Sequence, residues 1–78
     1  MKTAQNDYFH SSDLALVATL TIWFPIDSIQ REGQRATFVF QDSSDLQEKV
    51  TKFWNGQLRV SPLDYFNKLK TIKTRLYQ

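Results

Sequence analysis

The chain has 78 residues, of which 41% are hydrophobic and 14% aromatic, and it contains no cysteine. This length predicts one small globular domain, residues 1–78 with a flexible segment at 1–6, and the composition excludes a disordered chain, a disulfide scaffold and a thiolate metal site. The net charge of +2 is uneven, because residues 1–42 hold three basic against five acidic residues (−2), whereas residues 43–78 hold seven against three (+4).

Residues 7–12, DYFHSS, are predicted to form a short strand that leads into a helix. Ser11 or Ser12 is placed to cap that helix, and Asp13 lies in its first turn, where a negative charge favours the helix dipole. The preceding residues contain no apolar segment of the kind that secretory signals carry, so we expect no secretion.

A helix is predicted from Asp13 to Ile22 or Trp23, ending before Pro25 because the residue that precedes proline avoids helical geometry. Its apolar side chains point to more than one side, which predicts a central element covered by others. The longest apolar run, residues 14–26, is shorter than the about 20 residues that span a bilayer. We therefore expect a cytoplasmic protein without a membrane segment.

Residues 26–42 are predicted to form a β-hairpin, with a first strand ending near Arg31 and a second over 35–40. With Glu32 and Gly33 as the turn residues, glycine takes the second position, where a type I′ turn requires positive φ. This register pairs Arg31 with Gln34 and Ile29 with Ala36. The side chains that it places on the helix-facing side are Ile29, Ala36, Phe38 and Phe40.

A second helix is predicted over residues 42–54, capped by Asp42, Ser43 or Ser44. Ser44 with Gln47 has the spacing of a capping box. Its apolar stripe consists of Leu46, Val50, Phe53 and Trp54. Asn55 and Gly56 follow as residues that end helices.

A third helix is predicted to begin at Ser61, with Pro62 at its first position and Asp64 at its third. Its apolar stripe consists of Tyr65, Phe66, Leu69, Ile72 and Leu76. Together the elements predict an α+β fold of order β-α-β-β-α-α, in which a small antiparallel sheet, made of the short N-terminal strand and the hairpin, packs on helices.

Catalysis is not expected. The only histidine, His10, precedes two serines without the spacing of a triad, and one histidine with no cysteine cannot form a metal site of the nitrogen or sulfur type. The glycines are isolated, so no nucleotide-binding loop is present. We expect a non-catalytic protein without metal or cofactor.

Binding is the predicted role, either to a partner protein or in a homodimer. Trp54, Arg59 and Lys52 are predicted to form one binding patch, since exposed tryptophan marks interaction hot spots. The alternative for Trp54 is a structural role, covering the hairpin or the third helix. Tyr77, near the end of the chain, could close a core edge or contribute to a dimer contact.

The basic third helix raises a second hypothesis, which is binding to nucleic acid. The residues that would contact phosphates are Arg59, Lys68, Lys70, Lys73 and Arg75. Lys68 and Arg75 lie on one flank of the apolar stripe, however, and Lys70 and Lys73 lie on the other. Charges on one side would follow a phosphate backbone better, so this geometry favours the protein-binding hypothesis.

Three segments, SSDLALVATL, REGQRATFVFQDS and FWNGQLRVSPLDYFNKLKTIKTRLY, occur in this order. They resemble a family of small bacterial and phage domains of unknown function, over nearly all of residues 8–77. The resemblance supports the order of the elements and implies no activity. It implies a protein carried by a phage or other mobile element that acts by binding a partner.

Overall fold

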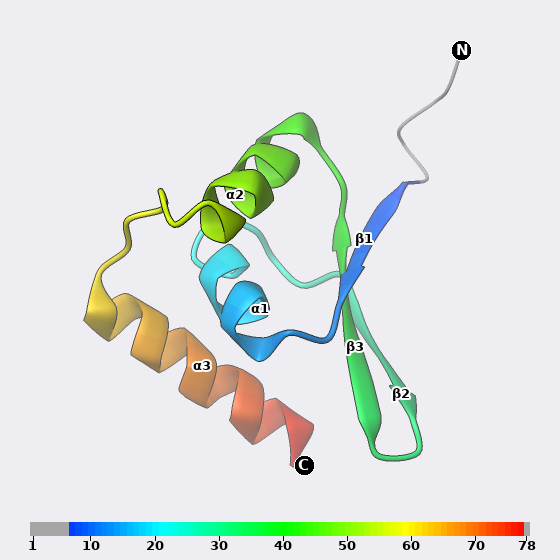
Figure 1. Cartoon of the computed structure of the whole chain (residues 1–78). Helices are drawn as coiled ribbons and strands as arrows, with labels where there is room; N and C mark the ends of the chain where they lie inside the picture. The colour runs from blue at the N-terminus through cyan, green and yellow to red at the C-terminus, as the bar shows by residue number, and fades with distance from the viewer. Residues whose placement is uncertain (1–6, 78) are drawn as a thin grey trace.

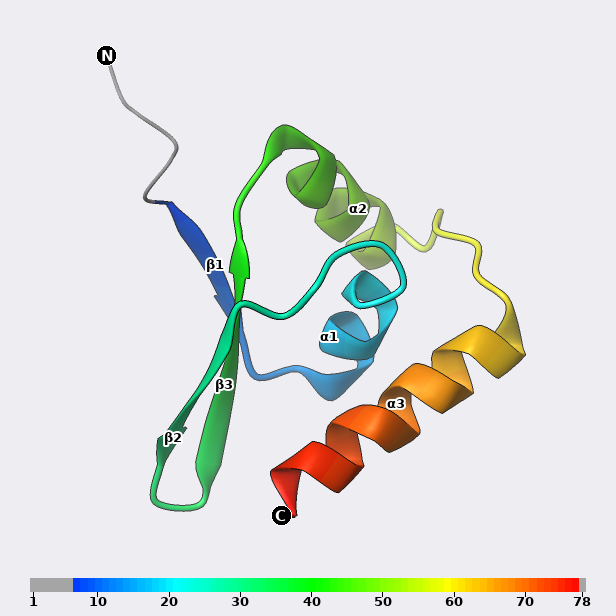
Figure 2. The ribbon, with the colours of Figure 1, turned by 180° about the vertical axis from the view of Figure 1, so that it is seen from behind.

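The computed structural model describes residues 7–77; the predicted flexible segment at 1–6 lies outside the described residues. The elements are β1 (Tyr8–Ser11), α1 (Leu14–Leu20), β2 (Ser28–Glu32), β3 (Arg35–Gln41), α2 (Ser44–Trp54) and α3 (Pro62–Leu76). The strands form one antiparallel sheet of order β1-β3-β2, and the three helices lie on one face of it (Figures 1 and 2). The predicted α+β fold and order of elements are confirmed.

The core is built around α1, which contacts β1, α2 and α3. Five consecutive residues of this helix, 16–20, are buried, as expected for a helix covered on several sides. The buried core side chains are Leu16, Val17, Ala18, Leu20, Phe38, Phe40, Leu46, Val50 and Ile72. The prediction that the first helix is the central element is therefore correct.

The cap of α1 differs from the prediction. Asp13, and neither Ser11 nor Ser12, is the N-cap, because its Oδ1 accepts hydrogen bonds from the backbone N–H groups of Ala15 and Leu16 at 3.0 and 3.2 Å. Ser11 instead accepts the N–H of Asp13 at its Oγ. A carboxylate can satisfy two free N–H groups and adds a charge favourable to the helix dipole.

The end of α1 also differs. The helix stops at Leu20, and the next residues form a turn in which Ile22 and Trp23 donate to the carbonyls three residues before them. Such tighter bonds are common where a helix ends. The ring centre of Trp23, in this turn, lies 4.5 Å from Nζ of Lys49, a cation–π contact that joins the end of α1 to α2.

The hairpin turn is displaced by one residue from the predicted position. Glu32 pairs with Arg35, so the turn residues are Gly33 and Gln34. Gly33 has φ +60° at the first turn position, and Gln34 does not have positive φ, which is the pattern of a type II′ turn and not of type I′.

The displaced turn leaves the faces of the hairpin as predicted. Ile29 pairs with Phe38 instead of Ala36, a shift of two positions in the partner. Because side chains alternate along a strand, a shift of two keeps each side chain on its face. Phe38 and Phe40 are accordingly buried under the helices, and Ile29 and Ala36 pack beside them.

Side-chain caps set the start of α2. Ser43 is the N-cap and its Oγ accepts the N–H of Leu46 at 3.1 Å. The predicted capping box of Ser44 and Gln47 is wrong, because the side-chain amide of Gln47 donates to Oδ1 of Asp42 at 2.9 Å.

The end of α2 depends on a glycine. Gly56 has φ +70°, its N–H donates to the Phe53 carbonyl, and the N–H of Gln57 donates to the Lys52 carbonyl, which is a Schellman motif. A Cβ added at Gly56 would meet no atom within 4 Å, so only the backbone conformation opposes a side chain there.

Gly56→Ala is therefore expected to lower the free energy of unfolding by about 1–2 kcal/mol, the penalty of a left-handed non-glycine residue. Urea unfolding measures this change. Gln57→Ala is the matched control, and an equal loss in both variants would contradict the argument.

The start of α3 is as predicted, with Ser61 as N-cap and Pro62 in the first turn. The predicted apolar stripe is wrong for Phe66, which is 55% exposed, whereas Ile72 is 2% exposed. Six residues separate the two, which places Phe66 about 120° from Ile72 around the helix. The other three members of the stripe, Tyr65, Leu69 and Leu76, pack against the core.

Candidate functional site

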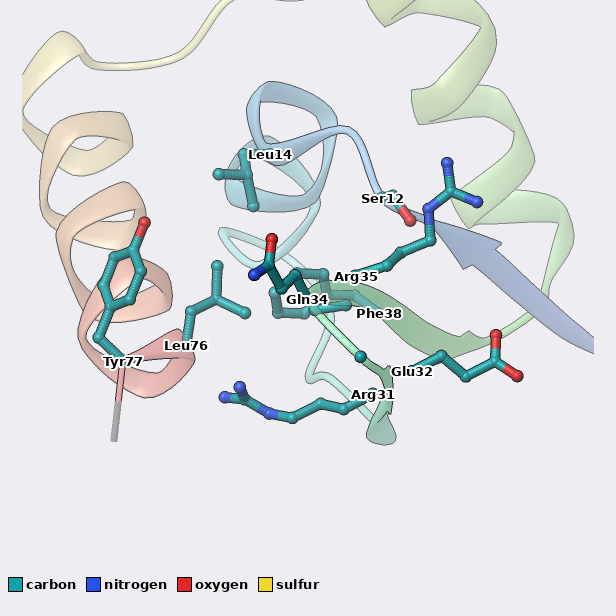
Figure 3. A pocket seen from close by; sticks show the side chains of 11 residues that line it. Ser12, Leu14, Arg31, Glu32, Gln34, Arg35, Phe38, Leu76 and Tyr77 are labelled. Atoms are coloured by element: carbon teal, nitrogen blue, oxygen red, sulfur yellow. The ribbon is translucent and has the colours of Figure 1, made fainter.

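A cleft of about 900 Å³ lies between the β2–β3 turn and the carboxyl end of α3 (Figure 3). We call it the hairpin–helix cleft. The residues that line it are Ser12, Leu14, Arg31, Glu32, Gly33, Gln34, Arg35, Ala36, Phe38, Leu76 and Tyr77.

The floor of the cleft is apolar and comes from three parts of the chain. Leu14 from α1, Ala36 from β3 and Leu76 from α3 are half-buried there, above the fully buried Phe38. These residues belong to the core or pack against it. The floor is therefore held by the same packing that holds the fold.

The rim is polar and positively charged. Arg31, Gln34, Arg35 and Tyr77 are exposed, and Glu32 is the one acid among the lining residues. The rim can pair with a carboxylate while the floor accepts an apolar group, since arginine forms two parallel hydrogen bonds with a carboxylate.

A long-range hydrogen bond joins the two walls of the cleft. Nη2 of Arg31 on β2 donates to the backbone carbonyl of Arg75 in the last turn of α3, at 2.9 Å. Carbonyls in this turn have no partner within the helix, and a cation there favours the helix dipole. Arg31 thus fixes the end of α3 beside the hairpin.

The residues of the predicted tryptophan patch do not all lie on one side of α2. Trp54 is 61% exposed, and its ring meets that of Phe53 edge to face at 5.0 Å. Lys52 forms an ion pair with Glu48 at 3.3 Å. It lies two positions before Trp54, so the two side chains are about 200° apart around the helix. Arg59 is exposed in the connection between α2 and α3.

Tyr77, the fourth predicted partner-binding residue, is 83% exposed and lines the hairpin–helix cleft. In Figure 3 its ring stands on the helix side of the cleft, beside Leu76. The structure therefore separates Tyr77, at the carboxyl end of α3, from Trp54, at the end of α2.

The basic residues of α3 are divided between two sides. Lys68 and Arg75 line a smaller cleft of about 200 Å³ formed with the connection between α1 and β2. Lys70 and Lys73 are exposed, and Nζ of Lys70 lies 5.6 Å from the ring centre of Phe66. This division agrees with the two flanks predicted from the sequence.

The hairpin side of the cleft was not predicted as a site. Arg31, Gln34 and Arg35 are far in sequence from α3, and no local pattern indicates that the end of this helix lies against them. The exposure of Phe66 does have a signal in the sequence, because its angle around the helix differs from that of Ile72.

Among residues 7–77, no group of three or more His, Cys, Asp or Glu side chains is placed to hold a metal ion. Within the same range, none of the helices has both the length and the apolar character needed to cross a membrane.

A family model matches nearly the whole chain. The model describes the domain of unknown function DUF5659, and it matches residues 6–78. No curated protein and no solved structure matches the chain. The resemblance to a family of small domains of unknown function is confirmed.

Proposed function

We propose from its surfaces that the chain, which belongs to the DUF5659 family of domains of unknown function, is a non-catalytic protein-binding module acting in the cytoplasm. From the resemblance of its segments to small bacterial and phage domains, we further propose that a phage or other mobile element encodes the chain and that the chain acts by binding a partner.

The hairpin–helix cleft is the observation that carries this proposal. Protein interfaces have an apolar centre and a polar rim, and arginine and tyrosine are enriched among the residues that dominate their binding energy. Leu14 and Leu76 provide the apolar centre here, and Arg31, Arg35 and Tyr77 provide the rim. The occupant is a partner segment with one apolar side chain close to a carboxylate.

Capture from an extract of the native host tests the proposal. The immobilised full chain is expected to retain a protein partner in the presence and absence of nuclease. Arg35→Glu should reduce the amount retained about tenfold, because it places a negative charge opposite the partner's carboxylate.

Arg59→Glu is the matched control, since it makes the same charge change at an exposed residue outside the cleft. It should leave capture unchanged. The opposite result, with Arg59→Glu losing the partner and Arg35→Glu keeping it, would move the binding surface to the region of Trp54 and Arg59.

Nucleic-acid binding is the second candidate, favoured by one observation. Lys70 and Lys73 are exposed on α3, with the ring of Phe66 open beside Lys70, and exposed aromatics near cations can stack bases. The nuclease arm separates the two candidates, because partners bridged by nucleic acid are lost on digestion. Retention should then also fall steeply with salt.

A further inference from the structure

The outward side of α3 carries a row of exposed side chains. We call it the outer stripe; its residues are Leu63, Phe66, Lys70 and Lys73 of the helix and Tyr77, its C-cap. Leu63 is 66% exposed, and Phe66 and Tyr77 are also among the exposed large hydrophobic residues. Ile72, the one residue of α3 that is fully buried, lies on the other side of the helix.

The spacing of the stripe is that of a helix-packing seam. Its positions follow one another at intervals of three, four, three and four residues, the repeat that keeps side chains in line along one helix face. Fourteen residues separate the first from the last, a length of about 21 Å at the rise of an α-helix. Such a narrow, straight row matches the contact face of one partner helix.

The charge of the outer stripe indicates the chemistry of its partner. Lys70 and Lys73 occupy its middle, and Lys70 approaches the ring of Phe66. The only acidic residue of α3 is Asp64, in the first turn and outside the stripe. An occupant must therefore combine apolar side chains for Leu63, Phe66 and Tyr77 with negative charges for the two lysines.

We propose that the outer stripe of α3 binds an acidic amphipathic helix of a partner protein. The proposal rests on the protein-binding function above and names the chemistry of a partner. Tyr77 lines the hairpin–helix cleft as well as the stripe, so a helix on α3 can extend directly into the segment that occupies the cleft.

A second copy of this chain fits the stripe poorly. Lys70 is the midpoint between Leu63 and Tyr77, so antiparallel packing of two copies would place Lys70 against Lys70. Parallel packing would align both lysines with their copies. Like charges directly opposed across an interface are unfavourable, whereas glutamates at these places would pair with the lysines.

Two synthetic peptides of 21 residues test the proposal by titration into the ¹⁵N-labelled full chain. Both carry leucine at alternating intervals of three and four; one has glutamate at the flanking positions and the other lysine. Amide shifts are expected along the outer stripe with the glutamate peptide and not with the lysine peptide. Phe66→Asp should lower the affinity of the chain for the glutamate peptide by about tenfold or more.

Thr71→Asp is the matched control, because it adds the same charge at an exposed residue of α3 outside the stripe. It should leave the affinity unchanged, and Phe66→Ala replaces Phe66→Asp if circular dichroism shows that the latter does not fold. The proposal is overturned by the absence of shifts at millimolar glutamate peptide, by equal binding of both peptides, or by an oligothymidine that shifts the stripe where the glutamate peptide does not.

Failure of this proposal can be told apart from failure of the proposed function. If Arg35→Glu abolishes capture of a host protein while the glutamate peptide leaves the stripe unchanged, the chain binds protein through the cleft and the stripe has no part in it. If neither the host extract nor the peptide binds, both are wrong.

Discussion

Replacing Phe40 by alanine is expected to lower the free energy of unfolding by about 3–5 kcal/mol and to leave a large fraction of the chain unfolded near 37 °C. Phe40 is 0% exposed in the central strand β3, opposite Phe9 and within the core that surrounds α1. Truncation removes the buried ring and leaves a cavity that neighbouring elements fill only in part. A domain of this length has roughly 4–12 kcal/mol of stability in total.

The measurement is urea unfolding followed by circular dichroism, and Trp54→Ala is the control. Both substitutions remove a large aromatic side chain, but Trp54 is mostly exposed and its main ring contact is with Phe53. We expect Trp54→Ala to cost no more than about 1.5 kcal/mol, the size of one aromatic pair. Equal losses in the two variants would assign Trp54 to the core.

Ile72→Ala is expected to lower the free energy of unfolding by about 3 kcal/mol and to loosen α3. Ile72 is the one fully buried residue of this helix, which also contacts the core through the half-buried Tyr65, Leu69 and Leu76. Its truncation removes the most buried apolar side chain of α3, and a loosened α3 would hold Leu76 and Tyr77 less firmly beside the hairpin–helix cleft.

Hydrogen exchange of the α3 amides measures the loosening, alongside urea unfolding. Leu63→Ala is the control on the same helix; because Leu63 is exposed, we expect a change within about 0.5 kcal/mol and unchanged exchange. If exchange in α3 speeds up equally in both variants, the helix is not held by Ile72.

Local chemistry was sufficient to predict the end of α2 and the start of α3. Ser61 caps the first turn of α3 and Pro62 opens that helix, whereas Gly56 ends α2 with a positive φ. Each of these signals acts within a few residues of the chain. The hairpin shows the limit of such reasoning. Gly33 had to take positive φ, but both the first and the second turn position allow this, so the turn was placed one residue too early.

The candidate sites also divide into residues that the sequence could indicate and residues that only the structure brings together. Tyr77 and the lysines of α3 could be proposed from their position and charge along one segment of the chain. The hairpin–helix cleft could not, because its lining residues run from Ser12 to Tyr77 and meet only after α3 packs on α1 and Arg31 reaches the last turn of that helix.

The sequence by itself determined the class of fold, the order of the elements and the central place of the first helix, because alternating apolar positions and capping residues act over short distances. The tertiary structure decided which surfaces remain open. The packing of α3 on α1 placed the end of α3 beside the hairpin and left the hairpin–helix cleft between them. Those outcomes depend on the angle at which whole elements meet, and no local run of residues encodes that angle.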